Sequence, residues 1–331
     1  DALPIYSGEF RLNEDGFIIE TRGGSGNAGK ISMESTQGSI NTTAGSLLAR
    51  SVSGNGGDIA QTAESNIATA DINSYSDAVS GDSGNGGNIA QTTGGNIATA
   101  ELNSFSTADS GNSAGDGGDI VQTAGGNIAT ASLSSSSTAG SGNSGHGGDI
   151  AQTAGGNIAT ASLSSTSETL SGNSGDGGDI AQTAGGNLIA ESLWSFSQAN
   201  RNSGNGGTIF ITANTIKPSN SNVARPGQDS EAMLPLRQAP EIEQLTIASF
   251  SVGSNPSGNA GNVEITANNL SNIEILTLSA NSESGMATIE SLGQENLQLN
   301  DLSIITSKQE TIEVPGRQPI EINVGTQGQS G

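Results

Sequence analysis

Single large aliphatic residues recur along the chain at intervals of about thirty positions. The first in each repeat, its anchor, is Ile59, Ile89, Ile120, Ile150 or Ile180. A second aliphatic follows eight residues later, at Ile67, Ile97, Ile128, Ile158 and Leu188. A third follows thirteen residues after the anchor, at Ile72, Leu102, Leu133, Leu163 and Leu193. Ser, Thr and Gly fill the intervals without a 3.6-residue apolar period, so the pattern predicts short strands rather than helices.

The fixed register of these three columns predicts parallel coils stacked on one another. Side chains one repeat apart would then lie at the strand spacing of about 4.8 Å, and each coil would bury its small apolar face on the next. We therefore predict an all-β fold, a right-handed, single-stranded parallel β-helix (solenoid) with about ten coils of ~30 residues. A meander of antiparallel hairpins would give similar strand signals but explains the register less well.

Two further columns mark the turns of the coil. Gly stands two residues before each anchor, at Gly57, Gly87, Gly118, Gly148 and Gly178, which indicates a positive φ or a close approach of two backbones. Asn precedes the second aliphatic, at Asn66, Asn96, Asn127, Asn157 and Asn187. Stacked amides can bond along the column, so this pattern predicts an asparagine ladder.

Proline placement divides the chain. It is absent between Ile5 and Lys217, as uninterrupted strands require, and then occurs at Pro218, Pro226, Pro235 and Pro240. The anchor spacing also widens there, to 54 residues between Ile209 and Val263. We predict first strands in 1–22, repetitive coils in 23–217, a Pro-rich insertion loop in 218–241, and further coils richer in aliphatics in 242–331.

Charge and composition exclude several partners. The net charge is −23, and no Lys or Arg occurs between Arg50 and Arg201, so neither nucleic acid nor an anionic membrane surface is an expected partner. No apolar run of about 18 residues is present, so direct membrane insertion is not expected. With 49 Gly, 3% aromatics and no Cys, the chain lacks disulfides and has few large side chains for an ordinary core.

Several phrases carry a family resemblance: SGNAGKI, SGNGGDIAQT, GNGGTIFITA, SGNAGNVEITANNL and NLQLNDLSIITS. They resemble the repeat region of filamentous haemagglutinin-like bacterial exoproteins, the passengers of two-partner secretion, over most of residues 23–331. The resemblance implies export through an outer-membrane secretion partner and a location outside the cell or on its surface. It also implies a β-helical rod with a structural or adhesive role toward carbohydrate or another cell-surface ligand.

Two columns of acidic and amide residues suggest a cation site. Asp58, Asn88, Asp119, Asp149 and Asp179 stand one residue before the anchors, and Asn55, Asn85, Asp116, His146 and Asp176 stand four before them. Oxygen donors about 5 Å apart suit Ca²⁺, which would relieve their repulsion. The calcium candidates are Asp116, Asp119, Asp149, Asp176 and Asp179, and the competing interpretation is that of solvated turn residues. No cofactor is required, and His146 is interpreted as a polar turn residue.

Aromatic residues are the candidates for adhesion. Tyr75, Phe105 and Phe196 lie sixteen residues after their anchors, and Trp194 is close by. If exposed, these rings could stack on sugars; if buried, they would pack a corner of the coil.

Two other functions are weighed against the rod. Threonine columns, Thr62, Thr92, Thr123, Thr153, Thr183 and Thr69, Thr99, Thr130, Thr160, could order water on an ice-binding face. Gln61, Gln91, Gln122, Gln152 and Gln182 adjoin the first column, however, and Thr is also a common strand former. A polysaccharide-degrading β-helix would need a site that breaks the repeat, but these coils are nearly interchangeable, so we expect no enzyme. Uncapped coil faces predict end-to-end or lateral self-association.

Overall fold

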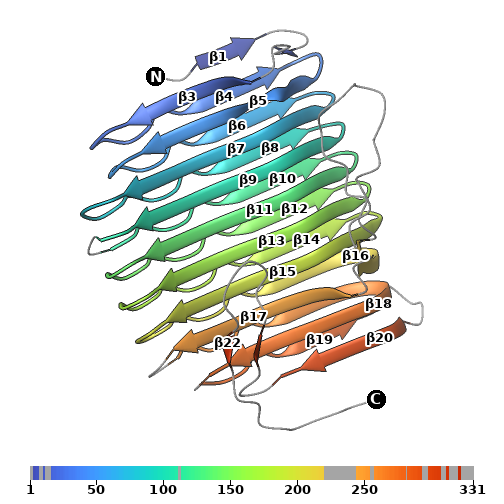
Figure 1. The fold of residues 1–331 in the computed structure, drawn as a ribbon. Helices are drawn as coiled ribbons and strands as arrows, with labels where there is room; N and C mark the ends of the chain where they lie inside the picture. The colour runs from blue at the N-terminus through green and yellow to red at the C-terminus, as the bar shows by residue number, and fades with distance from the viewer. Residues whose placement is uncertain are drawn as a thin grey trace.

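The computed structural model is an all-β solenoid whose parallel strands stack from β1 at one end to β20 at the other (Figure 1). It describes residues 3–6, 10–11, 16–110, 113–219, 244–253, 257–280, 282–292, 297–306, 311–312 and 320–321. The parallel solenoid with ~30-residue coils is confirmed. One strand ladder runs through ten stacked positions, namely Leu3, Ile31, Ile59, Ile89, Ile120, Ile150, Ile180, Ile209, Val263 and Ala287. Residues 220–243 and most of the chain after Ile305 lie outside the described residues.

Each repeat contributes one short and one long strand. The short strands are β6 (Ile59–Ala63), β8 (Ile89–Thr93), β10 (Ile120–Ala124), β12 (Ile150–Ala154) and β14 (Ile180–Ala184). The long strands are β7 (Ile67–Ala78), β9 (Ile97–Ala108), β11 (Ile128–Ala139), β13 (Ile158–Thr169) and β15 (Asn187–Ala199).

Further strands extend the stack at both ends. Before the repeats lie β1 (Leu3–Tyr6), β2 (Phe10–Arg11), β3 (Phe17–Gly23), β4 (Ile31–Ser35) and β5 (Ile40–Ser51). After them lie β16 (Ile209–Pro218), β17 (Leu245–Gly253), β18 (Val263–Ser279), β19 (Ala287–Glu290) and β20 (Gln298–Ile305). The pair β21 (Thr311–Ile312) and β22 (Ile320–Glu321) is antiparallel, so the prediction of coils throughout 242–331 is wrong for these two strands.

The strand register confirms that residues one repeat apart are stacked. Ile120 pairs with Ile150, and Ile150 pairs with Ile180, each in a parallel ladder. All three predicted aliphatic columns are at most 1% exposed in the five repeats and form one continuous core. Identical side chains therefore pack on identical side chains, which explains how one large aliphatic per strand suffices.

A ladder of glutamine side chains runs through the same core. Gln61, Gln91, Gln122, Gln152 and Gln182 are at most 1% exposed. From Gln91 to Gln182, each Nε2 donates to the Oε1 of the glutamine in the preceding coil at 2.7 Å. At the start of the ladder, Gln61 Nε2 donates to Met33 Sδ at 3.7 Å. The column of Thr69, Thr99, Thr130 and Thr160 is also buried, and its hydroxyls donate to the same Oε1 atoms at 2.9–3.0 Å. With the exception of Gln182 Oε1 at the end of the ladder, these amides are thus paired inside the core, where an unpaired one would be costly.

Buried serines join the turn glycines of neighbouring coils. Ser135 Oγ donates to the carbonyl of Gly118 at 2.8 Å and accepts from the amide of Gly148 at 2.9 Å. The same bridge recurs at Ser74, Ser104, Ser165 and Ser195. The Ser-rich segments of the sequence are therefore partly core, with backbone groups as their partners.

The glutamine ladder ends abruptly beside Ala190. In the next coil Ile211, and not a glutamine, pairs with Gln182. Within the coil of Gln182 itself, Ala190 stands where the preceding coil has Thr160. Gln182 Oε1 is consequently buried without a hydrogen-bond partner. Ala190→Thr should supply the missing donor and stabilise the protein by about 1 kcal/mol relative to Ala190→Val, which has the same shape but no hydroxyl. Denaturant unfolding of the two variants measures the difference, and a Val variant as stable as the Thr variant would contradict this account.

The Pro-rich segment interrupts a single coil. Pro218 pairs with Ala190, while Thr246 pairs with Ser192, so strands on either side of the segment continue the ladder of β15. Residues 220–243, which include most of the predicted insertion loop 218–241, lie outside the described residues. The chain thus leaves and rejoins the stack at adjacent positions of one strand ladder.

Candidate functional site: the Asp/Asn groove and the outer aromatic column

A groove of about 450 Å³ follows the turn that precedes the short strands. Its polar lining is Asn55, Asp58, Asn85, Asn88, Asp116, Asp119, His146 and Asp149, with pairs of glycines between them. Three of the five calcium candidates therefore share one surface. The other two, Asp176 and Asp179, continue the same columns one coil further on, through the hydrogen bonds described next.

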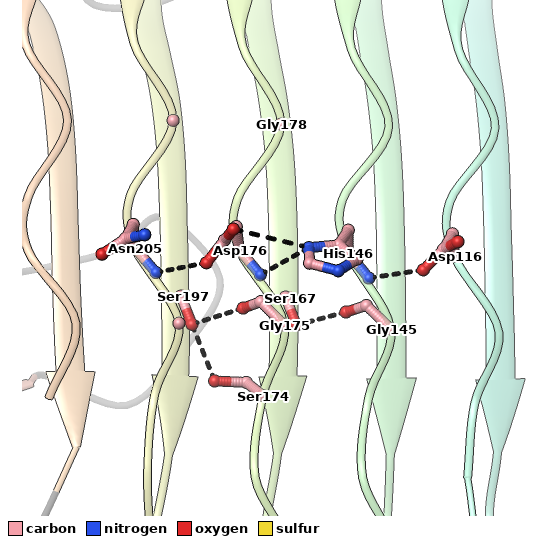
Figure 2. A network of polar contacts seen from close by, with 12 residues as sticks. Asp116, Gly145, His146, Ser167, Ser174, Gly175, Asp176, Gly178, Ser197 and Asn205 are labelled. Atoms are coloured by element: carbon pink, nitrogen blue, oxygen red, sulfur yellow. Dashed lines mark hydrogen bonds and ion pairs between the residues drawn. The ribbon is translucent and has the colours of Figure 1, made fainter. Parts of the chain in front are cut away.

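Each side chain in these columns accepts a hydrogen bond from the backbone of the next coil. In the column nearest the anchors, Asp149 N donates to Asp119 Oδ1 at 3.0 Å, and Asp179 N donates to Asp149 Oδ1 at 2.8 Å. Figure 2 shows the second column, in which His146 N donates to Asp116 Oδ1 at 2.8 Å and Asn205 N donates to Asp176 Oδ1 at 2.6 Å. Backbone groups that no strand ladder satisfies are therefore paired by side chains.

This role explains which residue types occupy the columns. Asn, Asp and His all carry an acceptor atom at the δ1 position, at a similar distance from the backbone. His146 fits because its Nδ1 accepts from the amide of Asp176 at 2.9 Å, which requires that this nitrogen carries no proton. As a polar turn residue, the role predicted for it, His146 therefore has a defined hydrogen-bond partner, the backbone amide of Asp176. The shared δ1 acceptor was visible in the sequence, but our interpretation passed over it.

The asparagine ladder is confirmed in the neighbouring turn. Backbone amides donate to the preceding Asn Oδ1 at 2.8 Å from Asn66 through Asn187. The side-chain amides of Asn96, Asn127 and Asn157 add a second bond at 3.3 Å. Among the described residues other than glycine, positive φ occurs at Asn272 and Asp301, so the ladder uses hydrogen bonding and not the left-handed conformation.

The columns do not assemble a dense set of metal ligands. Within the described ranges, no group of three or more His, Asp or Glu side chains is placed to hold a metal ion. One oxygen of each calcium candidate already accepts a backbone hydrogen bond, as Asp116, Asp119, Asp149, Asp176 and Asp179 all do. Calcium binding stays a prediction, and calorimetry of the whole chain with millimolar calcium checks it.

Tyr75 and Phe105 form a half-exposed aromatic pair on the outer face of β7 and β9. Their rings are stacked with centroids 4.5 Å apart and planes 5° apart. Arg50 precedes Tyr75 in the same column. Contacts with Tyr75, and then with Glu20, hold the pKa of Arg50 above its ordinary value, and Arg50 Nε donates to Glu20 Oε1 at 2.7 Å. These two adhesion candidates are accessible to a ligand.

Trp194 and Phe196 are buried, so their interpretation as exposed sugar-stacking residues is wrong. They are 6% and 1% exposed. The Phe196 ring stacks on Phe250 at 4.7 Å, and Trp194 meets Phe250 edge-on at 5.9 Å. The competing interpretation, in which the aromatic rings pack against protein, is the one that describes them.

The proposed ice-binding columns separate onto two sides of the sheet. Thr62, Thr92, Thr123, Thr153 and Thr183 are exposed, whereas the column of Thr69, Thr99, Thr130 and Thr160 is buried and cannot order external water. The adjoining glutamines also point inward, so the exposed threonines have Ala or Val as outer-face neighbours. One of the two predicted threonine rows is thus excluded from such a face.

Comparisons with known proteins name no relative for this chain. No family model, curated protein or solved structure matches it. Within the described residues, no helix is long and apolar enough to cross a membrane.

Proposed function

We propose that this chain is a structural and adhesive rod of a secreted or surface-exposed bacterial exoprotein. The observation that carries the proposal is the equivalence of the five central coils. The same core columns, amide ladders and serine bridges recur in register from Ile59 to Ala199. A stack of equivalent coils is suited to present or space binding surfaces. No described coil interrupts its ladders to assemble a catalytic group. Enzymatic activity is therefore not part of the proposal.

Export through an outer-membrane secretion partner belongs to the same proposal. Support comes from the resemblance of the repeat phrases and from the absence of Cys and of cations in the central coils. A strongly acidic rod repels other copies of itself and stays soluble. Because neighbouring coils stabilise one another, such a chain gains most of its stability only when several coils are stacked.

The adhesive surface that the structure supports best is centred on Tyr75 and Phe105. Asn73 and Asn103 lie two residues away on the same outer face, and Asn103 Nδ2 donates to Asn73 Oδ1 at 3.0 Å. Aromatic rings beside amide groups offer both stacking and hydrogen bonding, which suits a sugar ring with hydroxyls. In the next two coils the column continues as Ser136 and Thr166, so the aromatic surface is local.

A glycan array tests this surface. Tyr75→Ser combined with Phe105→Ser copies the serine that the next coil carries, so the fold should tolerate it. We expect roughly a 5- to 150-fold loss of glycan binding, because two lost aromatic stacking contacts of about 0.5–1.5 kcal/mol each total about 1–3 kcal/mol. Ser136→Thr, which copies the following coil, is the matched control and should bind as the parent does. Unchanged binding by the double variant would reject this adhesive surface.

A further inference from the structure

An apolar stripe covers the outer face of the sheet near the C-terminal end. It comprises Trp194 and Phe196 of β15, Ala248 and Phe250 of β17, and Leu276 and Leu278 of β18. Strand alternation places these side chains opposite the core residues Leu193, Ile247 and Ile275. The stripe is therefore a second apolar layer, on the side of the sheet that faces away from the interior.

The stripe begins abruptly and is deeply buried. In the two preceding coils the same columns carry Ser134, Ser136, Ser164 and Thr166. The stripe residues are nevertheless only 0–6% exposed. Strands β15 and β18, which pair with β17, lie beside it in the same sheet and cannot cover this face. Burial to this degree requires a further layer of chain over the stripe.

An unpaired donor indicates what that layer must offer. Trp194 Nε1 is buried and has no hydrogen-bond partner. A buried indole N–H ordinarily finds an acceptor, because leaving it unpaired costs about 1–3 kcal/mol. A peptide segment that places apolar side chains on the rings and a free carbonyl near the indole would meet both needs.

The C-terminal segment 307–331 has this chemistry and begins at the right place. Ile305 continues the column of Trp194, Ala248 and Leu276 and packs against the stripe. The chain then forms the antiparallel pair β21–β22, with Ile312 opposite Ile320. In the sequence, apolar residues alternate with polar ones at Ile312, Val314, Ile320, Ile322 and Val324. Such alternation gives a hairpin one apolar face, and its outer edge has unpaired carbonyls.

Other occupants fit less well. The stripe is already buried within a single chain, so a second copy is not needed. The insertion 220–243 lacks a comparable run of alternating apolar and polar residues, so it is poorly suited to form a strand with one apolar face.

We propose that the segment 307–331 docks its apolar hairpin face on the outer stripe and so closes the side of the rod. The occupant is this chain's own C-terminal hairpin, held by apolar contact with Trp194, Phe196 and Phe250 and by a backbone carbonyl that accepts from Trp194 Nε1. Docking explains why an aromatic cluster is buried on the outer face directly after two coils that carry Ser and Thr in the same columns.

The sole tryptophan of the chain makes the proposal measurable. Removal of residues 307–331 should shift Trp194 emission to the red and increase its quenching by acrylamide severalfold, while circular dichroism keeps the parallel-sheet signal. Ile312→Asn with Ile320→Asn should give the same change in a full-length chain. Thr311→Asn with Glu321→Gln, which alters the opposite hairpin face, is the matched control and should leave the emission as it is.

Several outcomes would overturn the proposal. If the truncated chain loses its circular dichroism signal for the sheet, the full-length variant Ile312→Asn with Ile320→Asn becomes the test. Unchanged Trp194 emission in that variant refutes docking. Exposure of Trp194 only after deletion of 220–243 would assign the cover to the insertion. Emission that depends on protein concentration would assign it to a second copy.

Discussion

Gln122→Leu is expected to destabilise the protein by about 2–6 kcal/mol, whereas Gln182→Leu should change its stability by less than about 1 kcal/mol. Both side chains are fully buried in one column, and the substitution is the same. They differ in their hydrogen-bond partners, because Ile211 and Ala190 stand beside Gln182 where Gln152 and Thr130 stand beside Gln122. Gln122 Oε1 accepts from Gln152 Nε2 at 2.7 Å and from Thr130 Oγ1 at 3.0 Å, so its loss leaves two donors unpaired in the core.

Gln182 lies at the end of the ladder, and its Oε1 already lacks a partner. Its replacement removes a buried unpaired acceptor and one donated bond, to Gln152 Oε1, which still accepts from Thr160. Urea unfolding of both variants, followed by circular dichroism, measures the two changes. Equal losses of stability would show that side-chain packing, and not the pairing of amides, determines the cost.

Gly148→Ala should be at least as damaging, with a loss of about 3 kcal/mol or more. A Cβ at this position would lie 2.4 Å from the carbonyl oxygen of Gly118 and 2.6 Å from Ser135 Oγ. The obstruction is mainly backbone of the preceding coil, so relief requires the two coils to separate. Of the two explanations that the glycine column allowed, close backbone approach is the correct one at Gly148.

Gly24→Ala is the matched control, since a Cβ there meets nothing within 4 Å. It should be neutral or stabilise the fold by up to about 1 kcal/mol, because alanine restricts the unfolded chain. Thermal unfolding of the two variants separates the effects. Similar midpoints for both would contradict the inter-coil contact at Gly148.

The stacking could be predicted from the sequence, because residues that recur at a fixed interval pair with their equivalents in the adjacent coils. Ile120, Ile150 and Ile180 carry that information without any reference to tertiary structure. The orientation of Gln122 was also predictable, since strand alternation from Ile120 places it inward. Our interpretation noted only that the glutamines adjoin the threonine column and did not assign them to the core, where isolated amides are rare. Repetition removes that restriction by giving each amide a partner in the next coil.

The burial of Trp194 could not be predicted in the same way. Its neighbours along the strand, Leu193 and Ser195, follow the ordinary repeat, and nothing local distinguishes a covered outer face from an exposed one. On our proposal, burial there depends on the C-terminal segment, whose position the repeat period does not encode. Tyr75, in a similar sequence context, is half-exposed for the same reason.

Cysteine cross-linking of Thr123→Cys with Thr153→Cys tests the central claim most directly. The chain has no native Cys, both threonines are exposed, and they are register partners on adjacent coils. Parallel strands about 4.8 Å apart lie within the range that a disulfide can bridge. We predict rapid formation of an intramolecular disulfide in this variant and none between Thr123→Cys and Thr183→Cys, which are two coils apart. Failure of the first pair to cross-link, or a bond in the second, would contradict the stacked coils.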